Sequence, residues 1–392
     1  MFQSFYTGLS GMLSFSKSLD TVSNNIANMN TPGFRGADSF YQSLSQGSGE
    51  QTGAGVQISG LGFRFSNGEM RQTGNNTDLA INGAGFFTLL KGDQTYFSRA
   101  GQFSFDDKGI LIERSSGAAV AVLNDGGQPG VLDLSGLKQN PATPTTKLTF
   151  NGNLSKAATS AHEIKGLIVY NKIGEEVKLD LKLEKDAVVP DAWKVTVTNS
   201  SGVTLHQGEI RFGPDGTPMN LYSSIQFNLT DSYGGESALS LNFGSAGDFS
   251  KTTSLAAGTT HSLKAKVEDG AAAGTLVDVT FDELGTVKLQ YSNGVSKNGP
   301  VLALMEIANK SSLQHVDGSI FTLSNKSDAQ LGKAGQPGFG KISAKSLELS
   351  NVDLSREFAD MIVIQRGYQA SSKIMNVANQ LLDQLFENTR GR

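Results

Sequence analysis

Pairs of adjacent acidic residues are the first candidates for chemistry in this sequence. Two carboxylates that lie close together can supply the general acid and the base or nucleophile of glycoside hydrolysis. Each pair stands beside a glycine that is typical of a turn: Asp106-Asp107 before Gly109, Glu175-Glu176 after Gly174, and Asp282-Glu283 before Gly285. None lies in the spacing of alternating acids that a calcium loop requires. We therefore interpret all three pairs as solvated turn residues.

Residues that bind metals, form disulfides or cradle phosphates are also scarce. Cysteine is absent, and the four histidines are isolated from one another in the sequence. Gly53-Ala-Gly55 and Gly83-Ala-Gly85 lack the third glycine of a dinucleotide-binding turn, and Gly8-Leu-Ser10-Gly11 lacks the spacing of a nucleophile elbow. The histidines are His162, His206, His261 and His315. The sequence thus predicts a protein that is not an enzyme, without catalytic residues, cofactor or metal.

The composition excludes further classes of protein. The chain has 392 residues, enough for two or three domains, and 33 Lys+Arg against 37 Asp+Glu give a net charge of −4. No basic excess points to nucleic acid, and no stretch approaches the ~20 apolar residues that span a bilayer. The first basic residue is Lys17, unlike a secretory signal, so we expect export without a cleaved leader. The lack of cysteine fits a chain that crosses compartments unfolded.

Residues Phe2 to Asn28 predict an amphipathic helix. The segment has no proline, and its apolar residues recur at alternating steps of three and four, as in a seven-residue repeat. Lys17 and Asp20 are its only charged residues, and Pro32 ends the helix because the residue before a proline avoids helical angles. The predicted seam consists of Phe2, Phe5, Leu9, Met12, Leu19 and Ile26.

A longer helix is predicted from Asp353 to Asn388, with Asn351 or Asp353 as its N-cap. Its 36 residues would extend about 54 Å, which is too long for a small globular core to cover. Apolar residues seven positions apart define its seam, and further apolar or small residues flank them. The seam consists of Leu354, Met361, Tyr368, Met375 and Leu382, and the flanking residues are Phe358, Ile364, Ser371, Ala378, Leu385 and Phe386.

The two apolar stripes leave two interpretations open. The terminal helices either pack against each other within one chain or become buried among copies of the chain. Both helices are polar but nearly uncharged outside their stripes, whereas exposed coiled coils normally carry charged rims. We therefore favour burial between molecules, and we expect the ends to be mostly disordered in a monomer.

Between the helices the sequence predicts a mainly β fold with two nested antiparallel domains. Alternating apolar and polar residues at 177–184 indicate a strand with one wet face, and Asn-Gly turns recur along the segment. Stretches rich in Thr and Gly mark the domain boundaries. We expect terminal helices at 1–30 and 351–392, a linker at 31–75, a discontinuous inner domain at 76–146 and 265–350, and an outer domain at 147–264.

Segments spread from residue 23 to 369 resemble the signatures of bacterial flagellar rod and hook proteins. Ser23–Arg35 is similar to their N-terminal motif, and Ala80–Phe87 with Tyr96–Phe103 resembles their first shared β segment. Leu347–Ser355 and Met361–Gln369 resemble their C-terminal signature. The chain length and the central β meander favour the hook branch of this family. The motif residues that we single out are Asn24, Asn25, Ala27, Asn28, Thr31, Gly33 and Phe34.

The resemblance implies a structural subunit that polymerises with copies of itself into the hook, a flexible tubular universal joint that transmits motor torque from rod to filament. The terminal helices would pack as coiled coils in the inner core of the helical tube, and the β domains would form outer shells. The implied partners are the flagellar rod, hook cap and hook–filament junction proteins and the type III flagellar export apparatus, with no nucleic acid and no membrane insertion. The implied location is the extracellular hook and basal body of the bacterial flagellum.

Two alternatives stay open from the sequence alone. A distal rod subunit would share the motifs, because Asn30-Thr-Pro-Gly-Phe-Arg35 resembles rod proteins as readily as hook proteins. A secreted β-rich adhesin would also be rich in Gly and Thr and free of cysteine. A secreted hydrolase is a weaker third, because it would need a catalytic constellation that the sequence lacks.

Overall fold

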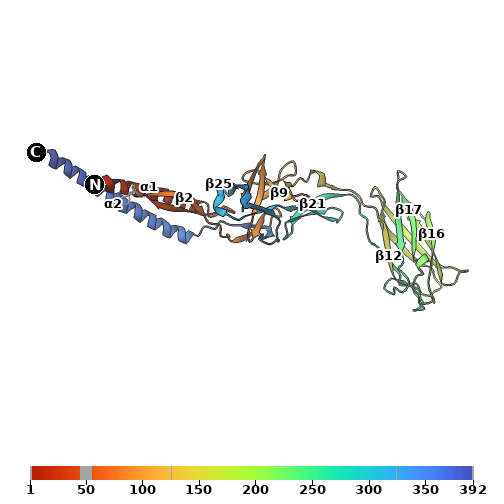
Figure 1. Ribbon diagram of the computed structural model, residues 1–392. Coiled ribbons are helices and arrows are strands. Elements are labelled where there is room, and N and C mark those ends of the chain that lie inside the picture. The colour runs from red at the N-terminus through yellow and green to blue at the C-terminus, as the bar shows by residue number, and fades with distance from the viewer. Residues whose placement is uncertain (1, 45–54, 125, 324, 391–392) are drawn as a thin grey trace. The chain divides into compact units, whose positions relative to one another are not determined.

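The chain divides into two compact units. The computed structural model describes residues 2–44, 55–124, 126–323 and 325–390. Unit 1 comprises Met1–Ser135, Val279–Leu289 and Lys297–Arg392, and unit 2 comprises Gly136–Asp278 and Gln290–Ser296. Both units consist mainly of β-strands, and unit 1 also carries the two long helices at the ends of the chain (Figure 1). The predicted fold class, mainly β with long terminal helices, is confirmed.

The terminal helices are α1 (Phe2–Ala27) and α2 (Leu354–Arg390), close to the predicted bounds. Asp353 is the N-cap of α2, because its Oδ1 accepts the backbone N–H groups of Ser355 at 2.8 Å and Arg356 at 3.3 Å. Beyond the end of α1, the Thr31 hydroxyl donates to Asn28 Oδ1 at 3.0 Å and closes the turn that leads into Pro32.

Residues 31–75, expected to be a linker, contain three strands. β1 (Ala37–Ser43) and β2 (Val56–Phe63) form an antiparallel hairpin that contacts α1 (Figure 1). β3 (Met70–Gln72) pairs with β29 (Ser346–Glu348). The glycines of β2 interrupt the alternation of apolar and polar residues by which a strand is predicted from the sequence. The Phe40 ring covers Gly62 so closely that a Cβ there would lie 2.2 Å from the ring.

The β part of unit 1 is built around β5. This strand pairs with β6, β9 and β24, in each case antiparallel. The core cluster here comprises Phe86, Phe97, Ile307, Leu313 and Phe321. The strands are β4 (Leu79–Asn82), β5 (Phe86–Lys91), β6 (Gln94–Ser98), β7 (Phe103–Phe105), β8 (Leu111–Glu113), β9 (Ala119–Leu123), β10 (Pro129–Val131), β24 (Leu304–Ile307), β25 (Leu313–Asp317), β26 (Ile320–Leu323), β27 (Ala329–Gly332) and β28 (Lys341–Ala344).

Unit 2 contains a β-sandwich. One sheet has the order β13-β14-β15-β16, and the other has the order β17-β18-β12-β19 with β20 also paired to β12. β12 departs from antiparallel pairing, because it runs parallel to β18 and to β19. The strands are β12 (Lys147–Asn153), β13 (His162–Tyr170), β14 (Glu176–Lys185), β15 (Ala192–Asn199), β16 (Thr204–Arg211), β17 (Ser224–Thr230), β18 (Glu236–Asn242), β19 (Thr252–Thr253) and β20 (Lys264–Val267).

Alternate residues of both sheets fill the core of this sandwich. Trp193 is 1% exposed, Leu241 is fully buried, and the Phe150 and Phe243 rings stack with centroids 4.3 Å apart. This is the arrangement expected from the alternation of apolar and polar residues along β14, whose leucines face inward while its lysines face water. The sandwich therefore has a dry core formed by residues from nearly every strand.

The ends of unit 2 lie outside the expected boundaries of 147 and 264. β11 (Gln139–Asn140) pairs with β21 (Gly274–Phe281), and Thr143 forms a bridge with Ala271. The Thr145 N–H donates to Tyr170 O at 2.8 Å, which ties the preceding segment to β13. β21, β22 (Thr286–Tyr291) and β23 (Ser296–Leu302) carry the chain between the two units.

Leu241→Ala should destabilise unit 2 by about 2–5 kcal/mol, because it opens a cavity in the sandwich core. Trp193 is the only tryptophan of the chain and is buried in the same core, so its fluorescence reports urea unfolding of this unit. The matched control is Val188→Ala at a side chain that is 87% exposed, which should leave the midpoint unchanged. Equal midpoints for the two variants would contradict the assigned core.

Candidate assembly site on the terminal helices

Small residues let α1 and α2 approach closely in an antiparallel pair. A Cβ on Gly11 would lie 2.7 Å from Ser371 Oγ, one on Gly8 would lie 3.1 Å from Ser371 O, and one on Gly367 would lie 2.5 Å from the Phe15 ring. The buried residues of α1 are Gly8, Gly11, Ser14, Ser18, Val22 and Asn25, and those of α2 are Glu357, Ile364, Ser371 and Ala378. The contact within one chain is therefore made mostly by glycine, serine and alanine.

The predicted apolar seams mostly lie beside this contact rather than in it. Of the residues named for the two stripes, Ile364, Ser371 and Ala378 are buried in the contact within one chain. The burial of the large apolar residues between copies of the chain stays a prediction. The sequence pattern did not single out the buried small residues of α1, which are Gly8, Gly11, Ser14 and Ser18. Phe5, Leu9, Met12, Leu19, Ile26, Met361, Met375 and Leu382 are half-buried, whereas Leu354, Phe358, Tyr368 and Leu385 are exposed. The Phe2 side chain lies outside the described residues.

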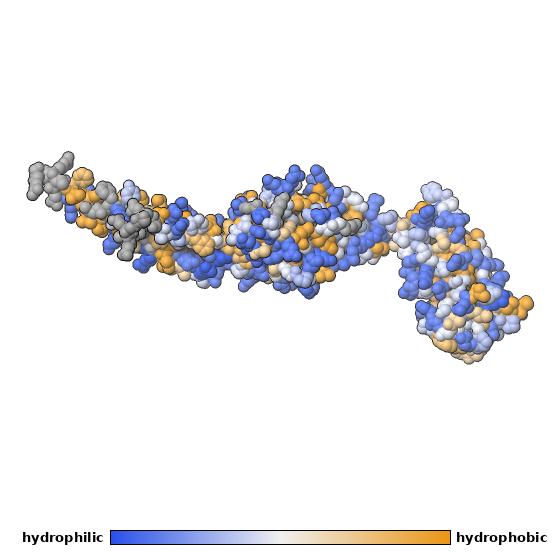
Figure 2. All heavy atoms as spheres, viewed as in Figure 1, coloured by the Kyte–Doolittle hydropathy of each residue, from blue (hydrophilic) through white to orange (hydrophobic). Residues whose placement is uncertain are grey.

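Large apolar side chains of the helix pair consequently face outward. Hydrophobic residues are visible along it in Figure 2, and a groove of about 480 Å³ lies between the start of α1 and the C-terminal half of α2. The groove is lined by Ser4, Ala370, Lys373, Ile374, Val377, Ala378 and Leu381. Ile362 and Val363 are exposed on the N-terminal half of α2. An apolar surface of this extent is typical of a protein–protein contact.

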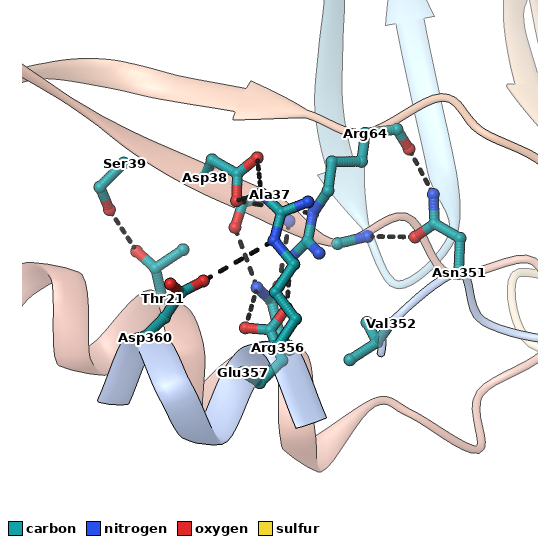
Figure 3. Close-up of polar contacts among 12 residues, drawn as sticks. Thr21, Ala37, Asp38, Ser39, Arg64, Asn351, Val352, Arg356, Glu357 and Asp360 are labelled. Atoms are coloured by element: carbon teal, nitrogen blue, oxygen red, sulfur yellow. Dashed lines mark hydrogen bonds and ion pairs between the residues drawn. The ribbon is translucent and has the colours of Figure 1, made fainter. Parts of the chain in front are cut away.

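A polar network fixes the helix pair to the β1–β2 hairpin (Figure 3). Asn25 is buried and bonds both backbone groups of Ala37, donating to the carbonyl at 2.9 Å and accepting from the N–H at 3.0 Å. Its Nδ2 also donates to Glu357 Oε2 at 3.0 Å. The other oxygen of Glu357 accepts a hydrogen bond from Arg64, which also lies 3.6 Å from Asp38. One asparagine thereby joins α1, β1 and α2.

Asn351, considered above as an N-cap, has a different role. Its Nδ2 donates to the carbonyl oxygens of Arg64 at 2.6 Å and Ser66 at 3.0 Å, and its Oδ1 accepts the Gly36 N–H at 2.9 Å (Figure 3). These bonds satisfy the backbone of the segments that lead into and out of the hairpin. Asn351 therefore fixes the start of α2 against the chain that follows α1.

A buried ion cluster joins the two ends of the chain to the β part of unit 1. Glu348 is 1% exposed and pairs with Arg35 at 2.7 Å and with Arg99 at 3.3 Å. Burial lowers the pKa of Arg99 to about 10, while the nearby Glu348 opposes that shift, so the guanidinium stays charged at neutral pH. Arg99 also donates to the carbonyl oxygens of Ile81 and Gly83. Glu348 is thus the carboxylate that both cations share.

Gly33 brings Arg35 to this cluster. Its φ of +69° favours glycine, and a Cβ here would lie 2.2 Å from the Ala100 backbone nitrogen. The Gly33 N–H donates to Glu348 O at 2.8 Å, and the following Phe34 is buried. Of the other motif residues, Asn24 accepts two hydrogen bonds from Asn28 Nδ2, and Ala27 is the last residue of α1. The motif therefore builds the turn that connects α1 to the β part.

Two of the three adjacent acidic pairs stabilise turns. Asp106 Oδ1 accepts the N–H groups of Lys108 and Ile110, and Asp282 Oδ1 accepts those of Leu284 and Thr286. Within the described ranges, no group of three or more His, Cys, Asp or Glu side chains could hold a metal ion. No helix that the structure describes is both long and apolar enough to cross a membrane.

Comparison with known proteins gives the family. Models described as "Flagella basal body rod protein", "Flagellar hook protein FlgE/F/G D1 domain" and "Flagellar basal body rod FlgEFG protein C-terminal" match residues 5–35, 80–205 and 343–387. The flagellar hook protein FlgE of Brucella suis is 32% identical over 405 residues, which cover 98% of each chain. The chain belongs to the flagellar hook protein FlgE family. The FlgE proteins of Treponema pallidum and Borreliella burgdorferi are 28% and 29% identical, covering 100% and 98% of this chain and 100% and 99% of theirs.

The three matched segments of this FlgE-family chain contain the residues that anchor its helices. Asn25 and Arg35 lie in the first segment, Arg99 lies in the second, and Glu348 and Glu357 lie in the third. Among solved structures, the Helicobacter pylori flagellar hook protein FlgE2 aligns over 71% of this chain and 100% of its own, with 12% identity and a TM-score of 0.49.

Glu348→Gln should destabilise unit 1 by about 3–5 kcal/mol, because it leaves two buried guanidinium groups without a counter-charge. Hydrogen exchange of β4 and β5, followed by mass spectrometry, measures the loss of protection. The matched control is Glu283→Gln, whose carboxylate forms an exposed pair with Lys341 and should have no measurable effect. The urea transition of Trp193 in unit 2 should stay unchanged in both variants, and equal protection in both would contradict the role of Glu348.

Proposed function

We propose that this chain is a structural subunit of the bacterial flagellar hook, which polymerises into a flexible tube that transmits motor torque from the rod to the filament. One observation carries the proposal. α1 and α2 contact each other mainly through glycine and serine, and their large apolar side chains face outward. A second copy of the chain can cover this surface and present the same surface to a third copy. Such a head-to-tail contact forms a filament when the copies do not close into a ring. Membership of the FlgE family supports the same conclusion.

The parts of the chain have different roles in this proposal. The terminal helices form the inner core of the polymer, where the exposed apolar residues of α2 become buried between subunits. The β part of unit 1 and the sandwich of unit 2 form the outer shells, whose polar surfaces slide past one another as the tube bends. The further partners are the rod, the hook cap, the hook–filament junction proteins and the flagellar export apparatus. The subunit then functions outside the cell.

A distal rod subunit was the alternative from the sequence, and similarity to flagellar hook proteins over 98–100% of the chain does not favour it. The two functions differ in the polymers that the purified chain should form. A hook subunit gives curved and pliable tubes, whereas a rod subunit gives straight and stiff ones. Electron microscopy of polymers assembled from the full chain distinguishes them.

Ile374→Asp and Val377→Asp should each abolish polymerisation without unfolding the monomer. Both side chains are about half exposed in the monomer, at 49% and 48%, so the charge becomes buried and unpaired only between subunits. The matched control is Asn376→Asp, which adds the same charge at an exposed polar position of the same turn. Sedimentation measures polymer, and circular dichroism measures the fold. Normal polymers from both apolar-site variants would contradict the proposed inner core.

Removal of the sandwich tests the division of roles. Residues Thr146 and Asp269 lie side by side, since the Thr146 N–H donates to Asp269 Oδ1 at 2.8 Å, so they can be joined after deletion of 147–268. The shortened chain should still polymerise, and its tubes should differ in stiffness or curvature from those of the full chain in electron micrographs. Loss of all polymers from a folded, shortened chain would contradict this division.

A further inference from the structure

Six charged side chains of the helix pair lack an ion-pair partner among the described residues. They comprise three cations and three anions, and each is exposed. The N-terminal turns of α2 differ, because Arg356 there pairs with Asp38 and Asp360. The six residues are Lys17, Asp20, Arg366, Lys373, Asp383 and Glu387. Exposed charges without a partner in their own chain can determine the position in which another molecule binds.

The antiparallel register of the pair places these charges along one axis. Gly11 faces Ser371, Phe15 faces Gly367, and Asn25 bonds to Glu357. In each of these pairs the two residue numbers add up to 382. Any residue of α1 therefore lies beside the α2 residue whose number is 382 minus its own number. By this rule Lys17 lies at the level of residue 365, next to Arg366, and Asp20 lies at the level of residue 362.

Five of the six charges consequently form two zones on the helix pair, and the sixth, Asp20, lies beside the zone of positive charge. We call Lys17, Arg366 and Lys373 the basic zone, and Asp383 and Glu387 the acidic zone. Asp383 lies 17 residues beyond Arg366, and Glu387 lies 14 residues beyond Lys373. At 1.5 Å per residue the two zones are separated by about 21–26 Å along α2.

We propose that the acidic zone of one subunit binds the basic zone of a second copy, which has the same orientation and is displaced by about 21–26 Å along the helix axis. The inference rests on the proposed function and adds the register of the subunits to it. The displacement leaves one zone of each kind free at the two ends of the contact, so a third copy can add in the same way. An antiparallel match would use both zones of both copies at once and close as a dimer.

The apolar surface of α2 agrees with this register. Ile374, Val377 and Leu381 lie between the two zones in the sequence, and they line the groove beside Ser4. A second helix pair displaced by the proposed distance would cover them together with the charges. Apolar burial then provides the affinity of the contact, and the complementary charges select one displacement among several.

Charge reversal tests the proposed register. Lys373→Glu and Glu387→Lys should each raise the critical concentration for polymerisation at least about tenfold, because each variant brings like charges together. The double variant restores opposite charges with reversed polarity and should polymerise at nearly the wild-type concentration. The matched control for Lys373→Glu is Lys108→Glu, which makes the same change of net charge at an exposed turn of the β part. Circular dichroism shows that each variant is folded.

Each outcome decides between the proposals. If the wild-type chain polymerises but both single variants do so equally well, or if the double variant stays as weak as the singles, the register is wrong and the proposed function stands. A stable dimer as the end state of assembly also overturns the register, because it requires the antiparallel match. A wild-type chain that forms no polymer at any concentration contradicts the proposed function and the register with it.

Discussion

The close approach of α1 and α2 is the constraint on which the rest of the structure depends. A Cβ at position 8 would press on the backbone of Ser371, and one at position 11 or 367 would collide with the Ser371 hydroxyl or the Phe15 ring. A seam this narrow holds few large side chains, so the phenylalanines, leucines and methionines of both helices stay at its margins. Because the small residues occupy the contact between the helices, the large apolar side chains form the surface that other molecules can bind.

Buried polar groups give this helix pair a fixed attachment. Asn25 and Glu357 connect the helices to the hairpin, and Glu348 connects both ends of the chain to the β part through Arg35 and Arg99. Buried charges contribute little net stability, but they are costly to misplace, so they specify one arrangement of the segments that meet there. A subunit that passes torque through its core needs such a defined connection between helices and β-strands.

Much of the architecture follows from local patterns in the sequence, whereas the anchoring contacts do not. Heptad spacing predicted both helices, and alternation predicted strands such as β14, because these signals act within a few residues. The β1–β2 hairpin was missed because glycines break its alternation. Glu348 lies 313 residues from Arg35 and 249 from Arg99, and no local pattern reveals that three such distant charges meet. The small residues on the α1 side of the helix contact were missed because glycine and serine carry no hydrophobic signal.

The adjacency of Thr146 and Asp269 has a consequence for the evolution of this family. The first and last residues of this inserted domain lie side by side. The size of the domain therefore has no influence on the distance between the two points at which it joins the rest of the chain. An insertion within 147–268 can therefore enlarge this domain without moving the two points at which it joins the rest of the chain.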